Sequence, residues 1–178
     1  MESYNETMPE LFPEGKRYNT FVGYYRRLYG ERLQKLVIDA GFTCPNRDGT
    51  VGRGGCSFCD NAAFHPSYST SGKSIAEQID EGIEFHQVRY RNTKHYLAYF
   101  QSYSNTYASA DYLRSLYMEA LNHPDIVGLS IGTRPDCFNE EIYSLISEFN
   151  RIKPIWIELG LQKKKEKTAD FIRRGYPL

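Results

Sequence analysis

The sequence has few of the features that mark membrane, secreted or strongly charged proteins. None of its hydrophobic runs approaches the roughly 20 apolar residues of a membrane-spanning helix. Its 22 basic residues balance 22 acidic ones, so the chain as a whole has no net attraction for nucleic acid or an anionic membrane. Residues 1–6 are polar and acidic, unlike a secretory signal. These absences favour a cytoplasmic protein with no membrane partner.

Cysteine is also scarce, with 4 in the whole chain, yet three of them lie within residues 44–59. Eleven residues separate Cys44 from Cys56, and two separate Cys56 from Cys59. Because thiols stay reduced in the cytoplasm, this grouping favours metal or redox chemistry over disulfides. Thiolates are soft ligands that suit iron–sulfur clusters, zinc and copper(I). The sequence therefore predicts a metal site in this loop.

Two kinds of metal site fit these ligands. Three thiolates on a four-iron cluster leave one iron open, and an open position permits catalysis. Alternatively, Cys44, Cys56, Cys59 and His65 could form a structural Cys₃His zinc site. We favour the cluster.

Strand-like and helix-like patterns alternate four times along the chain. The expected strands cover residues 33–40, 96–100, 126–131 and 155–159. The expected helices cover residues 21–28, a segment capped by Ser74, residues 113–121, a segment capped by Asn139, and residues 168–174. Residues 1–18 have no such pattern and are expected to form an irregular arm.

Alternation of this kind predicts an α/β fold with parallel strands, in which the loops that follow the strands meet at one edge of the sheet. The cysteine loop follows the first strand, so we expect it at the centre of that edge. Four strand–helix units are too few for an eight-unit barrel of about 250 residues. We therefore expect an open sheet of four strands, in a chain that is truncated.

Five short motifs stand at the expected strand ends. They are GFTCPNRDG at 41–49, GGCSFC at 54–59, YFQSYSNTY at 99–107, GTRPDC at 132–137 and ELGLQ at 158–162. In this order they resemble the radical S-adenosylmethionine (radical SAM) superfamily, in particular the branch of Fe–S oxidoreductases related to the Elongator catalytic subunit. The resemblance runs from about residue 18 to the end of the chain, and it implies a partial (β/α) barrel of the radical SAM type, truncated to about four strand–helix units, within residues 19–178.

The resemblance implies an enzyme that uses a [4Fe–4S] cluster to cleave S-adenosylmethionine to a 5′-deoxyadenosyl radical, which abstracts hydrogen from a substrate. It implies that Cys44, Cys56 and Cys59 bind the cluster. The residues that it implies for S-adenosylmethionine are Phe58, next to the adenine, and Gln101, Ser104, Asn105, Arg134 and Gln162. It also implies an electron donor such as flavodoxin or ferredoxin and suggests a tRNA base side chain as substrate.

Several of these residues also have simpler interpretations. Arg134 could form an ordinary ion pair within its own loop. Cys137 suits a small buried hydrophobic position better than a ligand role, with contact to substrate as the alternative. The lysine-rich run 163–167 could be a solvated surface or could contact RNA phosphates. The alternative class of protein is a zinc-stabilised module that binds nucleic acid or a partner without catalysis.

Overall fold

The computed structural model describes residues 17–60, 63, 65–90 and 93–177, and the chain divides into two units between Leu33 and Gln34. The arm expected at residues 1–18 lies outside the described residues, apart from residues 17 and 18. In the first unit, helix α1 (Phe21–Tyr29) begins after Thr20, whose hydroxyl accepts a hydrogen bond from Gly23 N at 2.9 Å. It ends at Gly30, a left-handed residue with φ 73°. The helix predicted here is confirmed.

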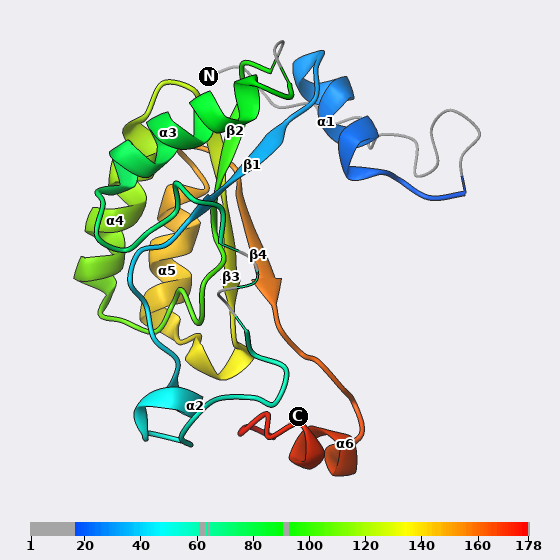
Figure 1. Ribbon diagram of the computed structural model, residues 1–178, viewed down its shortest axis with the longest axis vertical. Coiled ribbons are helices and arrows are strands. Elements are labelled where there is room, and N and C mark those ends of the chain that lie inside the picture. The colour runs from blue at the N-terminus through cyan, green and yellow to red at the C-terminus, as the bar shows by residue number, and fades with distance from the viewer. Residues whose placement is uncertain (1–16, 61–62, 64, 91–92, 178) are drawn as a thin grey trace. The chain divides into compact units, whose positions relative to one another are not determined.

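The second unit is built on a four-stranded parallel sheet (Figure 1). Its strands are β1 (Gln34–Ile38), β2 (Tyr96–Phe100), β3 (Ile126–Thr133) and β4 (Ile155–Leu159), in the order β1-β2-β3-β4. The α/β fold with parallel strands is confirmed. The first strand is shorter than predicted, whereas the third continues past residue 131, because it pairs with β4 as far as Thr133.

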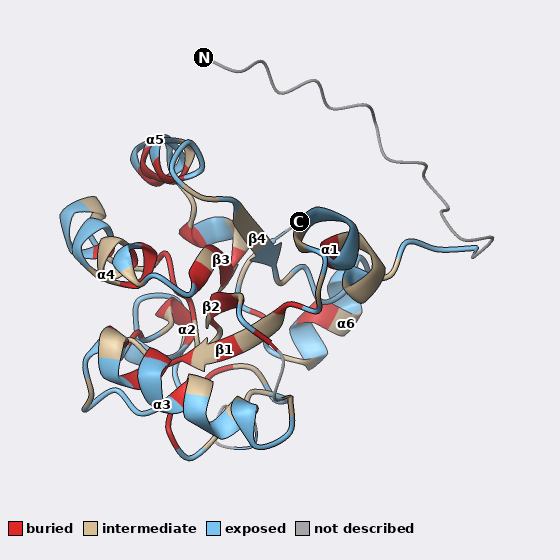
Figure 2. Cartoon of the chain, turned by 90° about the horizontal axis from the view of Figure 1, so that it is seen from above, coloured by how far each residue is buried: buried red, intermediate tan, exposed pale blue. Residues whose placement is uncertain are grey.

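Three helices connect consecutive strands and lie along one face of the sheet (Figure 2). They are α3 (Ile75–Gln87), α4 (Ala110–Asn122) and α5 (Glu140–Phe149). A side chain at each N-cap accepts a hydrogen bond from the first turn, namely Ser74, Ser109 and Asn139. The predicted caps Ser74 and Asn139 are confirmed, and Ser74 forms a capping box with Glu77.

The core lies between these helices and the sheet. Leu36 and Ile38 of β1 point into it and are fully buried. The Tyr117 ring of α4 contacts Phe100 of β2 and Phe149 of α5, with ring centroids 4.9 and 6.2 Å apart. Side chains alternate between the two faces of a strand, so the intervening residues of the strands point to the opposite face of the sheet.

Three short helices follow the strands. Helix α2 (Pro45–Asp48) and the 3₁₀ turn η3 (Pro135–Cys137) each carry proline in the first turn, and neither was predicted because segments this short show no helical period. Helix α6 (Glu166–Phe171) ends earlier than the predicted 168–174, because Arg173 and Gly175 take positive φ values of 54° and 78°. Figure 1 shows α2 and α6 beyond the carboxyl ends of the strands.

None of the helices in the described ranges is both long and apolar enough to cross a membrane.

Candidate metal and cofactor site

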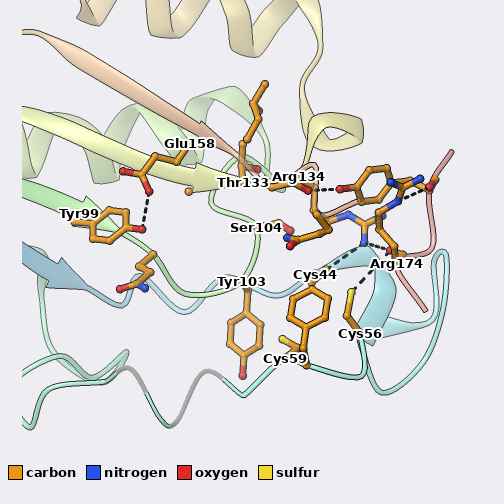
Figure 3. A pocket seen from close by; sticks show the side chains of 17 residues that line it. Cys44, Cys56, Cys59, Tyr99, Tyr103, Ser104, Thr133, Arg134, Glu158 and Arg174 are labelled. Atoms are coloured by element: carbon orange, nitrogen blue, oxygen red, sulfur yellow. Dashed lines mark hydrogen bonds between the residues drawn. The ribbon is translucent and has the colours of Figure 1, made fainter. Parts of the chain in front are cut away.

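A cavity of about 390 Å³ opens at the carboxyl ends of the strands (Figure 3). Its wall comes from the cysteine loop, from the segments at the ends of β2, β3 and β4, and from the last turn of the chain near Arg174 and Tyr176. Cys44, Cys56 and Cys59 all line it. The structure thus brings the three cysteines of residues 44–59 to one cavity, of a size typical of sites for small ligands.

Hydrogen bonds between backbone groups of the cysteine loop, residues 44–59, hold it in shape. Cys44 caps α2, and its carbonyl accepts a hydrogen bond from Arg47 N at 2.8 Å. Cys56 and Cys59 flank a turn in which Cys59 N donates to Cys56 O at 3.1 Å. Gly54 and Gly55 both have φ 81°, a region that disfavours residues with a Cβ atom. Glycine at these two positions therefore lets the backbone make the tight turn that precedes Cys56.

Hydrogen-bond donors from outside the turn approach two of the sulfurs. Asn46 Nδ2 lies 3.4 Å from Cys56 Sγ, and Arg134 Nη1 lies 3.8 Å from Cys44 Sγ. Burial raises the pKa of the third thiol, Cys59, and the positive charge of Arg47 offsets only part of the rise.

Arg134 is held by its own loop. Its Nε and Nη2 donate to the two carboxylate oxygens of Asp136 at 2.9 and 2.6 Å. Burial by itself would lower the pKa of Arg134, but the Asp136 carboxylate raises it, so the guanidinium stays charged. The ion pair considered from the sequence is present. Nη1 faces Cys44 and also donates to the carbonyl of Arg174 at 3.1 Å.

Four of the other residues expected to contact S-adenosylmethionine line the same cavity, namely Phe58, Gln101, Ser104 and Gln162. The Phe58 ring is half exposed at its edge. Asn105 is the exception, because its side chain is fully buried away from the cavity. Its amide donates to Gly132 O at 2.7 Å and so joins the loops that follow β2 and β3.

His65 lies elsewhere. Its Nε2 is 2.7 Å from Ser102 Oγ, and its Nδ1 is 3.2 Å from Ser69 O, so both ring nitrogens face partners outside the cysteine loop. Across the described residues, no three or more His, Cys, Asp or Glu side chains gather closely enough to hold a single metal ion. Cys137 is buried in η3 and does not line the cavity of the other three cysteines.

Tyr99 and Glu158 also line the cavity, and they belong to a polar cluster that was not expected from the sequence. The Tyr99 hydroxyl donates to Glu158 Oε2 at 2.8 Å, and Ser130 Oγ donates to Glu158 Oε1 at 2.8 Å. Lys35 Nζ pairs with the same Glu158 oxygen and lies 4.2 Å from the centre of the Tyr99 ring. These four residues form a polar cluster on the sheet face opposite the helices. The available signal was a charged residue within each of two mainly apolar strands, Lys35 in β1 and Glu158 in β4.

The last turn of the chain closes another side of the cavity. Arg174 is fully buried and donates to the carbonyls of Tyr176, Leu161 and Lys163 at 2.9, 3.2 and 2.7 Å. The Tyr176 ring lies 4.5 Å from the Arg174 guanidinium carbon and 4.6 Å from that of Arg134. No sequence pattern pointed to this segment as part of the site.

The fold and the site together define an α/β protein with a three-cysteine cavity at the carboxyl edge of a parallel sheet. No protein-family model matches the chain. It is 45% identical over 163 residues to Protein YhcC of Escherichia coli strain K12, a match that covers 90% of this chain and 51% of that protein. It is 39% identical over 167 residues to the uncharacterised protein YtqA of Bacillus subtilis strain 168, a match that covers 90% of this chain and 50% of that protein.

A more distant relative comes from an archaeon. The chain is 30% identical over 170 residues to the uncharacterised protein MJ0486 of Methanocaldococcus jannaschii. This match covers 94% of this chain and 51% of that protein. The chain thus spans about half the length of the curated relatives that it matches.

Proposed function

We propose that this chain carries the cofactor site of a radical SAM enzyme, in which Cys44, Cys56 and Cys59 bind a [4Fe–4S] cluster. The observation that carries the proposal is the convergence of these three thiols on one cavity together with the ends of β2, β3 and β4. Parallel α/β proteins form their sites at this edge of the sheet. The five motifs described above lie along it.

The donor set fits such a cluster. Each thiolate of a three-cysteine cluster binds its own iron, so the sulfurs need to line one cavity rather than meet at one point. All three cysteines are partly exposed, as ligands of an added group must be. The cavity extends beyond them along the strand ends, which leaves space for a second, organic ligand.

The bound cluster would supply the electron that cleaves S-adenosylmethionine to methionine and a 5′-deoxyadenosyl radical, and this radical abstracts hydrogen from the substrate. The residues of this chain bind and orient. Phe58 offers an apolar ring surface for the adenine, and Gln101, Ser104 and Gln162 offer polar groups to the amino-acid part. Tyr99 and Glu158 form the wall on the sheet side, where we place the substrate.

The finer architecture is part of the same proposal. We infer a partial (β/α) barrel, in which β1 to β4 supply the first four strands and the sheet face opposite α3, α4 and α5 supplies the inner wall. The polar cluster of Lys35, Tyr99, Ser130 and Glu158 on that face supports this, because the outside of such a barrel would be covered by helices. The relatives are about twice as long as the matched stretch, which leaves room for further strand–helix units in proteins of this kind.

A cytoplasmic setting, an electron donor such as flavodoxin or ferredoxin, and a tRNA substrate complete the proposal. For tRNA, the supporting feature is the exposed run 163–167, which directly follows Gln162 at the cavity. Its lysines can neutralise phosphates, so tRNA binding should weaken steeply as salt rises. Filter binding at increasing salt, with Lys163, Lys164 and Lys165 replaced by Ala as the comparison, tests this part separately.

The test of the main proposal is anaerobic reconstitution with iron and sulfide, followed by reduction with dithionite and addition of S-adenosylmethionine. We expect a brown protein that forms 5′-deoxyadenosine and methionine, measured by liquid chromatography and mass spectrometry. Cys44→Ala serves as the control and should form neither. A colourless protein with stoichiometric zinc would support the zinc-stabilised module instead, and a bound cluster without 5′-deoxyadenosine would refute the catalytic proposal.

A further inference from the structure

The side chain of Asn46, which points toward Cys56, lies between two glycines. A Cβ atom on Gly52 would lie 2.2 Å from Asn46 Oδ1, and one on Gly175 would lie 2.7 Å from it. Gly52 belongs to the cysteine loop, whereas Gly175 belongs to the last turn of the chain. Any larger residue at either position would displace the Asn46 amide, so both segments are shaped around it.

The orientation of this amide is fixed by its partners. Asn46 Nδ2 donates to the carbonyls of Arg173 at 2.6 Å and Arg174 at 3.4 Å. Carbonyl oxygens only accept hydrogen bonds, so the nitrogen and not the oxygen must face them. The same nitrogen lies 3.4 Å from Cys56 Sγ, within reach of a hydrogen bond to sulfur. Asn46 is therefore a buried donor aimed at one of the three candidate ligands.

The carbonyl of Arg174 also contacts the second donor. Arg134 Nη1 donates to it at 3.1 Å while lying 3.8 Å from Cys44 Sγ. One backbone oxygen from the end of the chain thus lies beside the donors for two different cysteines. Arg174 is itself anchored by its buried guanidinium, so this oxygen has a fixed place.

We propose that Asn46 is a positioning residue for the candidate metal centre. One of its two N–H groups is held by the carbonyl of Arg173. The other lies between the carbonyl of Arg174 and Cys56 Sγ, donates a hydrogen bond to this sulfur and raises the reduction potential of the centre. The inference rests on the proposed [4Fe–4S] cluster. Reduction adds negative charge to the cluster and its thiolates, and a donor at a ligand sulfur stabilises that charge.

The test compares Asn46→Ala with Gln78→Ala. Gln78 is a matched control, because it is also a buried amide that donates to two backbone carbonyls, those of Asp39 and Lys73, but it lies outside the cavity. Both variants and the wild type are reconstituted anaerobically and titrated by electron paramagnetic resonance at controlled potential. For Asn46→Ala we expect a more negative midpoint, with a several-fold lower ratio of reduced to oxidised cluster at the wild-type midpoint. A tenfold change in this ratio corresponds to about 59 mV for a one-electron couple.

Gly52→Ala provides a second variant that keeps Asn46 but displaces its amide. It should shift the midpoint in the same direction. Loss of the cluster from Asn46→Ala but not from Gln78→Ala would also support the positioning role. Equal behaviour of Asn46→Ala and Gln78→Ala would overturn it, whether both keep the wild-type midpoint or both lose the cluster. A wild-type chain that binds no cluster is a different result, because it refutes the proposed function itself.

Discussion

The hydroxyl of Tyr99 lies 2.8 Å from a carboxylate oxygen of Glu158, although β3 separates the strands that carry them. The strand between them presents only small residues at this level. Ser130 pairs in register with Tyr99, and Gly132 pairs with Glu158. Because neither has a bulky side chain, the two longer side chains meet over β3. Small residues in β3 thus make the polar cluster possible.

The pH dependence of stability should report this cluster. Burial alone would raise the pKa of Glu158, but hydrogen bonds from Lys35, Tyr99 and Ser130 outweigh it and lower the pKa below its usual value of 4.5. A lowered folded pKa contributes stability above the unfolded pKa, and this contribution is lost as the pH falls through the folded value. Glu158→Gln should therefore cost stability at pH 7, and the difference from wild type should shrink below pH 4.5.

We expect the cost at pH 7 to stay below about 1 kcal/mol, because the Glu158 side chain is 43% exposed and solvent screens its interactions. Urea unfolding of both proteins between pH 3 and pH 7 measures it. Tyr99→Phe removes a single donor and should show a smaller effect of the same sign. A Glu158→Gln difference that stays constant over the whole pH range would contradict this interpretation.

The four cysteines should separate into two groups. Replacing Cys44, Cys56 or Cys59 by Ser should abolish the brown absorbance and reduce bound iron and sulfide after reconstitution, because each loses a soft ligand. Cys137→Ser should retain the cluster. Cys137 lies outside the cavity, and burial raises its pKa to about 11, so it stays a thiol at neutral pH. Iron loss in Cys137→Ser equal to that in the other three would show that the assignment of ligands is wrong.

Arg174 should matter for stability because its side chain is fully buried. In Arg174→Met the carbonyls of Leu161, Lys163 and Tyr176 lose a buried donor, which should lower the free energy of unfolding by about 1–3 kcal/mol. Arg174→Lys should recover only part of this, because an ammonium lacks the planar fork. Lys164→Met, an exposed substitution in the same segment, is the control. Urea unfolding measures the free energy of unfolding of the three variants. Equal values for Arg174→Met and Lys164→Met would refute the stabilising role of Arg174.

The capping box of α3 offers a test of the fold that is independent of the site. Ser74→Ala removes the hydroxyl that accepts from Glu77 N at 3.2 Å, and it should cost about 0.5–2 kcal/mol. Ser71→Ala, at an exposed serine of the preceding turn, should be close to neutral. Thermal unfolding followed by circular dichroism measures both. A Ser74→Ala melting temperature at the wild-type value would mean that the box does not contribute.

Helix α3 and the strands could be predicted because their signals are local. The Ser74 cap, the apolar spacing that follows it and the apolar runs of the strands depend only on near neighbours in the chain. Helix α2 could not be predicted in this way, since four residues carry no period. The bounds of α6 were wrong for a related reason. Arg173 has a positive φ in a segment whose backbone carbonyl binds Asn46. Because Arg173 is not a glycine, the sequence does not indicate this backbone conformation.

The sequence by itself determined the α/β alternation and the three cysteines with their spacing, because strand and helix periods and ligand types are written in contiguous residues. Only the tertiary structure decided what surrounds these cysteines. Asn46 and the carbonyl of Arg173 that orients it are 127 positions apart. Tyr99 meets Glu158 across a whole strand, and Asn105 turns away from the cavity to bind Gly132. Contacts of this kind arise when distant segments pack together, and no local pattern encodes them.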